Sequence, residues 1–325
     1  MRAALSWKFL LAMALASPAS AQPATTMLDA IPGPVEIDRT TVTQDIAFKI
    51  DRHDRMTVPV RLGGRGPYRF LVDTGADRTA VSTAIAKELG LTNGPMATLH
   101  SVTGTSMVQT ANVPNLELSH DRVRSVEAPV LEAAHMGADG ILGVDSLRSQ
   151  RVLFNFKTRV ISIVPSIQRE VRDEAGTIVV RGKLRRGHLI VTSATANGVP
   201  MTVILDTGSE ITMGNAALRR KLEARRKLAP AEKIEMTSVT GQKLIGDAVH
   251  MKEVRIGGVV LKDLVILFSD AKIFRALDLE AKPAVLLGMN AMQAFDKVSI
   301  DFAKKQMRMV VPEQSSLDSA LMAAR

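Results

Sequence analysis

Residues 69–82 read Arg-Phe-Leu-Val-Asp-Thr-Gly-Ala-Asp-Arg-Thr-Ala-Val-Ser. The apolar run at 70–72 predicts a buried strand that ends on Asp73, at a turn opened by Thr74 and Gly75. A carboxylate at the end of a buried strand is costly unless other groups hydrogen-bond to it or use it. For a single copy of this pattern, an aspartate that caps its own turn is the alternative interpretation.

The same arrangement occurs again at residues 203–209, Val-Ile-Leu-Asp-Thr-Gly-Ser, around Asp206. Pro67 and Pro200 stand at the same distance before the two aspartates, so the register of the preceding hairpin is kept. Other segments recur downstream in the same order: Ser-Val-Thr-Gly at 101–104 and 238–241, and Gly-Ile-Leu-Gly at 140–143, answered by Val-Leu-Leu-Gly at 285–288. An internal repeat of this kind predicts two tandem units.

The rest of the chain predicts mainly β-structure. Short alternating apolar segments begin near residue 46 and are separated by glycine-rich or Asn-Gly turns. Two helices are expected, one over 83–89 with Ser82 as its N-cap and one over 216–227. The predicted fold class is therefore all-β with short helices, in two domains related by pseudo-twofold symmetry.

The domain boundaries follow from the repeat and from the polar segments around it. The expected organisation is a signal peptide at 1–21, a flexible leader at 22–44, an N-terminal domain at 45–166, a linker at 167–176, a C-terminal domain at 177–312 and a tail at 313–325.

The first residues predict a cleavable export signal. Arg2 and Lys8 are followed by an apolar run at 9–16, and Ala-Ser-Ala at 19–21 is typical of a cut after Ala21. The run is shorter than the roughly 20 residues of a membrane-spanning helix; an uncleaved anchor is the alternative. The chain has no cysteine, which excludes thiol catalysis, disulfides and cysteine–metal sites. Export without disulfides is compatible with a bacterial periplasm.

The formal net charge of +9 raises the question of anionic partners. The chain has one tryptophan and one tyrosine and so lacks aromatic residues to stack on bases, and nucleic acid is not expected as a partner. Basic residues gather at 181–186 and 219–227. The second group is interpreted as the solvated face of a helix, with weak contact with an anionic envelope surface as the alternative.

No cofactor and no metal are expected. The six histidines show no metal-ligand spacing and are interpreted as surface or packing residues: His53, His100, His120, His135, His188 and His250. The chain also lacks a G-x-S-x-G elbow and a phosphate loop.

The two aspartates can meet in one site if the units pack about a pseudo-twofold axis. Two neighbouring carboxylates cannot both ionise easily, so Asp73 and Asp206 would share a proton. The charged member can take a proton from a water, and the neutral member can donate to the oxygen of a carbonyl under attack. The pattern predicts hydrolysis of an amide without a covalent intermediate.

The residues that follow each aspartate are expected to support it. Thr74 and Thr207 can lock the two turns together by hydroxyl-to-backbone hydrogen bonds, and Gly75 and Gly208 allow backbone to approach closely.

Two further glycines, Gly104 and Gly241, each lie at the tip of two strand-like arms. They are expected to be mobile flaps that cover an extended peptide held by main-chain hydrogen bonds. Ordinary hairpin glycines are the alternative.

The sequence resembles the retroviral-type (retropepsin-like) aspartic proteases, as a bacterial tandem of two fused units. The resemblance covers roughly residues 50–312 and rests on these segments: 71–77, the Gly104 flap and 140–143, then 204–209, the Gly241 flap and 286–288. It implies two acid-protease β-barrel domains, catalysis by Asp73 and Asp206, and an apolar-Leu-Gly segment behind each catalytic turn.

The departures from this resemblance also carry expectations. Glu210 stands where the first unit has Asp77, so contacts with the substrate backbone are expected to differ between the halves. Val144 and Met289 replace the arginine of the viral enzymes, so the ion-pair network of the viral dimer is expected to be absent. The single tyrosine, Tyr68, lies in neither flap, which favours the retroviral type over the pepsin type.

One difference between the two turns predicts where the proton resides. Ser209 can donate a hydrogen bond to a neighbouring aspartate oxygen, whereas Ala76 cannot. A hydrogen bond to the charged form lowers a pKa, so Asp206 is expected to be the ionised member and Asp73 the proton carrier.

The sequence thus predicts an aspartic endopeptidase acting on extended or unfolded segments of exported or envelope proteins, as a monomer with an internal pseudo-dimer. Two alternatives remain. One is a catalytically silent peptide-binding or scaffold protein of the same fold, and the other is an enzyme active only as an intermolecular dimer.

Overall fold

The structure is a computed structural model that describes residues 7–8, 35–37, 57–101, 105–118, 121–167, 174, 176–269 and 271–312. The expectations for the tail at 313–325, the flap glycine Gly104 and most of the signal peptide and leader lie outside the described residues. The described chain is mainly β with short helices, so the predicted fold class is confirmed.

The first half forms an eight-stranded sheet in the order β1-β6-β7-β3-β4-β9-β5-β8. Its strands are β1 (Trp7–Lys8), β3 (Thr57–Leu62), β4 (Arg65–Val72), β5 (Ala80–Ser82), β6 (Asn93–His100), β7 (Thr105–Leu118), β8 (Asp121–Leu131) and β9 (Gly140–Leu142). An additional pairing between β7 and β8 closes the sheet into a barrel. The hairpin of β3 and β4 ends on Asp73, as predicted.

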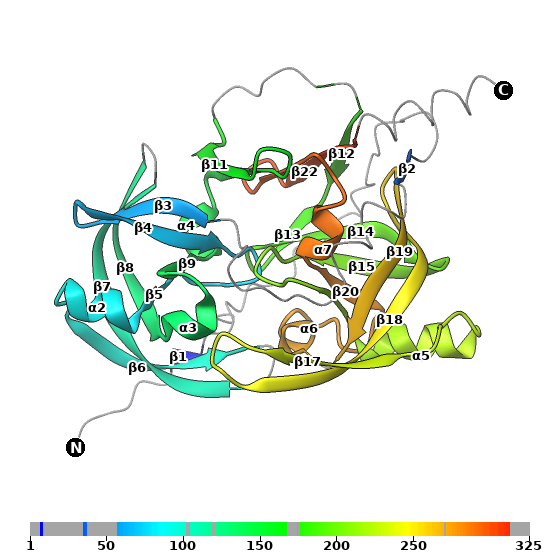
Figure 1. The fold of residues 1–325 in the computed structure, drawn as a ribbon, viewed down its shortest axis with the longest axis horizontal. Coiled ribbons are helices and arrows are strands. Elements are labelled where there is room, and N and C mark those ends of the chain that lie inside the picture. Colours follow the sequence, from blue (N-terminus) through cyan, green and yellow to red (C-terminus); the bar gives the residue numbers. More distant parts are fainter. Residues whose placement is uncertain are drawn as a thin grey trace, which may run out of the picture.

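The second half repeats this topology in the order β13-β14-β15-β20-β16-β19-β18-β17, closed by a β14–β18 pairing, with β2 added beside β19. Its strands are β2 (Val35–Ile37), β13 (Lys183–Arg185), β14 (His188–Ala196), β15 (Val199–Leu205), β16 (Thr212–Gly214), β17 (Glu232–Thr237), β18 (Lys243–Ile256), β19 (Val259–Phe268) and β20 (Ala284–Leu287). The two halves lie side by side in Figure 1.

A third sheet joins the halves. Its five strands, in the order β11-β10-β21-β22-β12, are β10 (Gln150–Asn155), β11 (Val160–Pro165), β12 (Thr177–Arg181), β21 (Lys297–Asp301) and β22 (Gln306–Val310). The segment at 152–163, expected simply to close the first unit, forms a hairpin whose β10 pairs antiparallel with β21 of the second half. Figure 1 shows this sheet above the two barrels.

The core is continuous across this junction. One cluster of buried apolar side chains includes Phe70 of the first barrel, Phe154 and Ile300 of the shared sheet and Val203 of the second barrel. Burying such a side chain stabilises a fold by about 1.5–3 kcal/mol. The halves are therefore packed against each other through their hydrophobic interior.

Within the described residues, six short helices connect the strands: α2 (Thr83–Glu88), α3 (Ala133–Met136), α4 (Val144–Leu147), α5 (Ala216–Ala224), α6 (Lys272–Ala276) and α7 (Met289–Met292). Ser82 caps α2 as predicted, because its hydroxyl accepts from Ile85 N at 3.2 Å. The basic helix α5 ends earlier than predicted, with Arg226 at a φ of 54°. No helix in the described ranges has the length and apolar character needed to cross a membrane.

Candidate active site

Each Asp-Thr-Gly turn follows a strand that has a neighbouring strand on both sides in the sheet of its barrel. β4 pairs in parallel with β9, and Asp73 N donates to Leu142 O at 2.9 Å. In the second half β15 pairs in parallel with β20, and Asp206 N donates to Leu287 O at 3.1 Å. The apolar-Leu-Gly segments thus lie directly beside the strands that end on Asp73 and Asp206, which agrees with what the resemblance implies.

The two turns are joined by crossed threonine hydrogen bonds. Thr74 Oγ1 donates to Leu205 O at 2.8 Å, and Thr207 Oγ1 donates to Val72 O at 2.6 Å. Each hydroxyl also accepts from the main-chain N–H of the other threonine, at 3.1 Å in both cases. Thr74 and Thr207 are both buried. The hydroxyl-to-backbone bonds expected from the sequence are present.

Each aspartate lies against the glycine of the opposite turn. A Cβ atom on Gly75 would lie 2.4 Å from Asp206 Oδ1, and one on Gly208 would lie 2.2 Å from Asp73 Cγ. Both distances are far below van der Waals contact, so only glycine fits. Each glycine N–H also donates to the aspartate of its own turn, at 2.8 Å in the first and 3.1 Å in the second. The structure thereby brings the two carboxylates together within one chain.

The electrostatics of the pair contradict the sequence-based assignment of the proton. Burial, and then the charge of Asp73, raise the pKa of Asp206 to about 7, although the N–H groups of Gly208 and Ser209 and the charge of His188 lower it. The Ser209 hydroxyl donates to Ile211 O at 2.7 Å. The prediction that Asp206 is the ionised member assumed a hydrogen bond from this hydroxyl to an aspartate oxygen, and that assumption is wrong because the O–H is directed to Ile211 O.

A second tier of pseudo-symmetric hydrogen bonds supports the turns. Asp145 Oδ1 accepts from Thr79 N and Oγ1, at 3.0 and 2.8 Å. In the second half Asn290 Oδ1 accepts from Thr212 N and Oγ1, at 2.8 and 2.7 Å. These pairs fix the loop after each Asp-Thr-Gly turn to the helix after each Leu-Gly segment. The sequence analysis missed them, although Asp145 and Asn290 stand at equivalent places in the repeat.

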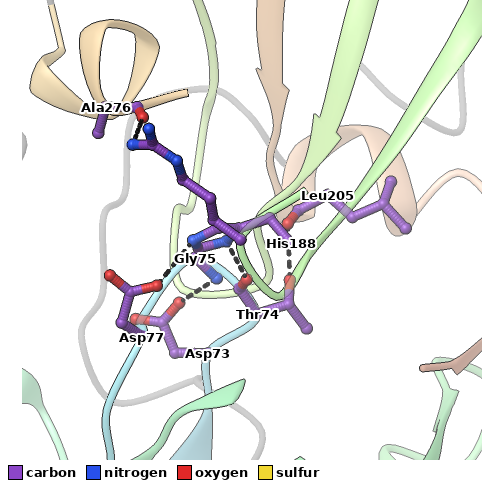
Figure 2. A network of polar contacts seen from close by, with 8 residues as sticks. Asp73, Thr74, Gly75, Asp77, His188, Leu205 and Ala276 are labelled. Atoms are coloured by element: carbon purple, nitrogen blue, oxygen red, sulfur yellow. Dashed lines mark hydrogen bonds and ion pairs between the residues drawn. The ribbon is translucent and has the colours of Figure 1, made fainter. Parts of the chain in front are cut away.

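His188 is the residue of this site that the sequence analysis most clearly missed. Its side chain is fully buried, and Figure 2 shows it between Thr74 and Asp77. Nδ1 lies 3.1 Å from Thr74 O, and Nε2 lies 3.0 Å from Asp77 Oδ1. Burial alone lowers the pKa of His188, but the hydrogen bond and charge of Asp77 outweigh it and leave the pKa raised. His188 therefore links the two halves of the site through Asp77, although Val144 and Met289 stand where the viral enzymes have arginine.

The second flap reaches across to the first half. Gly241 has a φ of 79°, and a Cβ atom on it would lie 2.5 Å from Cε1 of His135 on α3. Val239, also in the flap, packs against an apolar cluster of the first half that has Ala76 at its edge. Figure 1 shows the β17–β18 hairpin extending toward α3. On the other side, Lys272 Nζ of α6 donates to Thr105 Oγ1 at the start of β7, at 2.6 Å.

The remaining predicted residues are placed as follows. Asp77 contacts His188, and Glu210 lies in the equivalent loop, where its carbonyl oxygen accepts from Asn290 N at 3.0 Å. The described residues contain no group of three or more histidine, aspartate or glutamate side chains placed to hold a metal ion.

The comparisons with known proteins agree with this geometry. Residues 58–149 match the family described as "gag-polyprotein putative aspartyl protease", and residues 192–291 match the family described as "Aspartyl protease". Each matched stretch contains one Asp-Thr-Gly turn and the Leu-Gly segment beside it. The chain therefore belongs to the retropepsin-like aspartic proteases, with two units in tandem.

Among solved structures, the chain is similar to a retropepsin-like aspartic protease from Rickettsia conorii. The identity is 23%, the match covers 41% of this chain and 89% of that chain, and the TM-score is 0.29. None of the curated protein sequences matches the chain.

Proposed function

We propose that this protein is an aspartic endopeptidase that hydrolyses peptide bonds of exported or envelope proteins in the periplasm. The observation that carries the proposal is the close approach of Asp73 and Asp206, each against the glycine of the opposite turn. A protein that only binds peptides needs neither the carboxylate pair nor a raised pKa on one member.

The proposed mechanism assigns different roles to the two aspartates. Asp206 holds a proton because its pKa is raised to about 7, and it donates that proton to the carbonyl oxygen of the scissile bond. Asp73, as a carboxylate, takes a proton from the attacking water, which forms its bond to the carbonyl carbon. Collapse of the tetrahedral intermediate then breaks the C–N bond, while Asp73 passes its proton to the leaving nitrogen and Asp206 regains one from the hydroxyl group.

The proposed substrate is an extended or unfolded segment that lies between the two barrels. The flap at Gly241 would cover it, and the apolar side chains near Ala76 would contact its side chains. Because both aspartates belong to one chain, the proposed active form is a monomer with an internal pseudo-dimer.

The test is cleavage of an unfolded protein by the purified chain from pH 3 to pH 8, with and without a statine-type transition-state mimic. We expect cleavage that the mimic inhibits, and loss of cleavage in both Asp73→Asn and Asp206→Asn. Glu223→Gln is the matched control, because Glu223 is an exposed acid that pairs with Arg219 on α5, outside the site. Absence of inhibitable cleavage at every pH would favour a peptide-binding protein.

The assembly is tested by mixing the two inactive variants. If active sites form between chains, a mixture of Asp73→Asn and Asp206→Asn chains can place intact turns opposite each other and recover activity. We expect no recovery at any mixing ratio. Recovery would establish the intermolecular dimer and overturn the monomeric site.

A further inference from the structure

The buried side chain of His188 joins the first catalytic turn to the second half of the chain. We propose that His188 is an imidazolium that positions this turn and supplies a fixed positive charge to the aspartate pair, an inference that, for its effect on catalysis, rests on the proposed peptidase function. His188 would be a positioning residue, since it contacts Thr74 and Asp77 and not the reacting atoms.

The number of N–H groups that the two contacts of His188 require indicates that its imidazole is charged. The Thr74 carbonyl oxygen can only accept a hydrogen bond, and an ionised Asp77 carboxylate also offers only acceptors. A neutral imidazole has one N–H and would leave one of the two contacts, at 3.1 and 3.0 Å, without a proton. The imidazolium has two N–H groups and satisfies both. A buried group in this position is costly if one of its partners stays unpaired.

The location of His188 explains how it positions the turn. It begins β14 of the second barrel, and Arg186, two residues before it, is anchored by a hydrogen bond to Ala276 O and by an ion pair with Asp278. Thr74 is thus held from the second half on two sides, by Leu205 through its hydroxyl and by His188 through its carbonyl (Figure 2). Asp73 directly precedes Thr74, so this clamp limits the movement of the catalytic carboxylate.

The charge of His188 acts on the pair as well. The carboxylates whose charge acts on the imidazole are Asp77, which contacts it, and Asp206 of the opposite turn. The nearby guanidinium of Arg186 is directed to Ala276 and Asp278. Because a buried cation favours the charged form of a neighbouring carboxylate, His188 opposes the burial that raises the pKa of Asp206. Removing the cation should therefore make Asp206 hold its proton to higher pH.

The first experiment tests the charge without relying on activity. Selective ¹⁵N labelling of histidine in the full chain reports the protonation state of each ring by NMR. We expect one ring with both nitrogens protonated at pH 7.5, and the same ring in the neutral form in Asp77→Asn. The amide introduced by this substitution can donate to Nε2, so the neutral ring keeps both contacts and the variant can fold. A ring that is neutral in the wild type at pH 7.5, or unaltered in Asp77→Asn, overturns the proposal.

The second experiment measures the pH dependence of kcat/KM. In His188→Gln we expect the alkaline limb to move upward by about half a pH unit or more, because a cation near the dyad is lost. His188→Arg keeps a positive charge, and its limb should stay within the error of the wild type. His250→Gln is the matched control, since it removes an exposed histidine that lies 3.5 Å from Asp263. An unmoved limb in a folded, active His188→Gln overturns the electrostatic role.

The two proposals fail in distinguishable ways. A wild-type chain with no inhibitable cleavage would refute the peptidase function, and the NMR experiment would still decide whether His188 is charged. If His188→Gln does not fold, Asp77→Asn takes its place in the kinetic experiment. It removes the Asp77 carboxylate together with the imidazolium charge, so the limb should move upward by less than in His188→Gln. An active Asp77→Asn whose limb does not move would then overturn the proposed role of the charge.

Discussion

Replacing Thr74 by valine tests whether the crossed threonine bonds hold the two halves of the site together. Valine keeps the shape of the side chain and removes the hydroxyl, which donates to Leu205 O at 2.8 Å and accepts from Thr207 N at 3.1 Å. Both partners are then left buried and unpaired. Each such group costs about 1–3 kcal/mol, so the free energy of unfolding should fall by about 2–6 kcal/mol.

Thr74→Ser is the control for this substitution, because serine keeps the hydroxyl and loses one methyl group, at a cost of about 1 kcal/mol. Thr207→Val should be as costly as Thr74→Val, since Thr207 makes the mirror-image bonds to Val72 O and Thr74 N. Urea unfolding followed by far-ultraviolet circular dichroism measures all three variants. The only tryptophan, Trp7, lies in the predicted signal peptide, so tryptophan fluorescence is unsuitable.

The expected result is a lower urea midpoint for both valine variants with an unchanged slope, which indicates lost stability and not a change in the unfolded state. Equal midpoints for Thr74→Val and Thr74→Ser would refute the reasoning. That outcome would mean that the hydroxyl contributes nothing and that the shared sheet and core alone hold the turns together.

Three further predictions concern the same site. The rate of cleavage should fall above about pH 7, because the proposed mechanism needs a proton on Asp206 and its pKa is raised to about 7; a pH–rate profile without a limb near there would contradict the assignment. The raised pKa of Asp206 contributes stability that is complete below pH 3.8 and is lost as the pH rises through about 7. Compared with the wild type, Asp206→Asn should therefore have a higher urea midpoint at pH 8 and nearly the same midpoint at pH 3. Gly208→Ala should lower kcat at least tenfold and Gly198→Ala should not, because only the former places a Cβ atom 2.2 Å from Asp73 Cγ. Equal kcat values for the two variants would argue against the close approach of Gly208 to Asp73.

The sequence predicted the centre of the site because its signal is local and repeated. Asp73, Thr74 and Gly75 form one contiguous turn, and the second copy at Asp206 supplies the partner. The position of each Leu-Gly segment beside its turn was implied by the family resemblance, and the structure adds that the two strands pair in parallel. Where sequence neighbours determine structure, the prediction and the structure agree.

The features that the sequence did not predict share a physical cause. Each depends on a partner residue or strand that the local sequence pattern does not contain. The continuation of β7 through Pro114 depends on β8, which pairs with β7 on both sides of Asn115. The hydroxyl of Ser209 donates to Ile211 O and not to an aspartate.

His188 has no motif around it, and its role arises only when the second barrel packs against the first turn. The shared five-stranded sheet was missed for the same reason, because its central pairing joins residues of the two halves.

The fusion of two units allows an asymmetry that a dimer of identical chains cannot hold. In a homodimer every group near one aspartate is repeated near the other, so the proton and the direction of a bound peptide are not fixed by the protein. Here Ala76 and Val239 belong to the apolar cluster on one side, whereas the equivalent cluster of the second half contains Phe274 and Leu244. The apolar clusters of the two halves thus differ in composition, and Asp206 differs from Asp73 in the residues that follow its turn. If the proposed mechanism holds, we expect one peptide direction to be preferred, because only one orientation places a given side chain beside its matching apolar cluster while the scissile carbonyl oxygen faces Asp206.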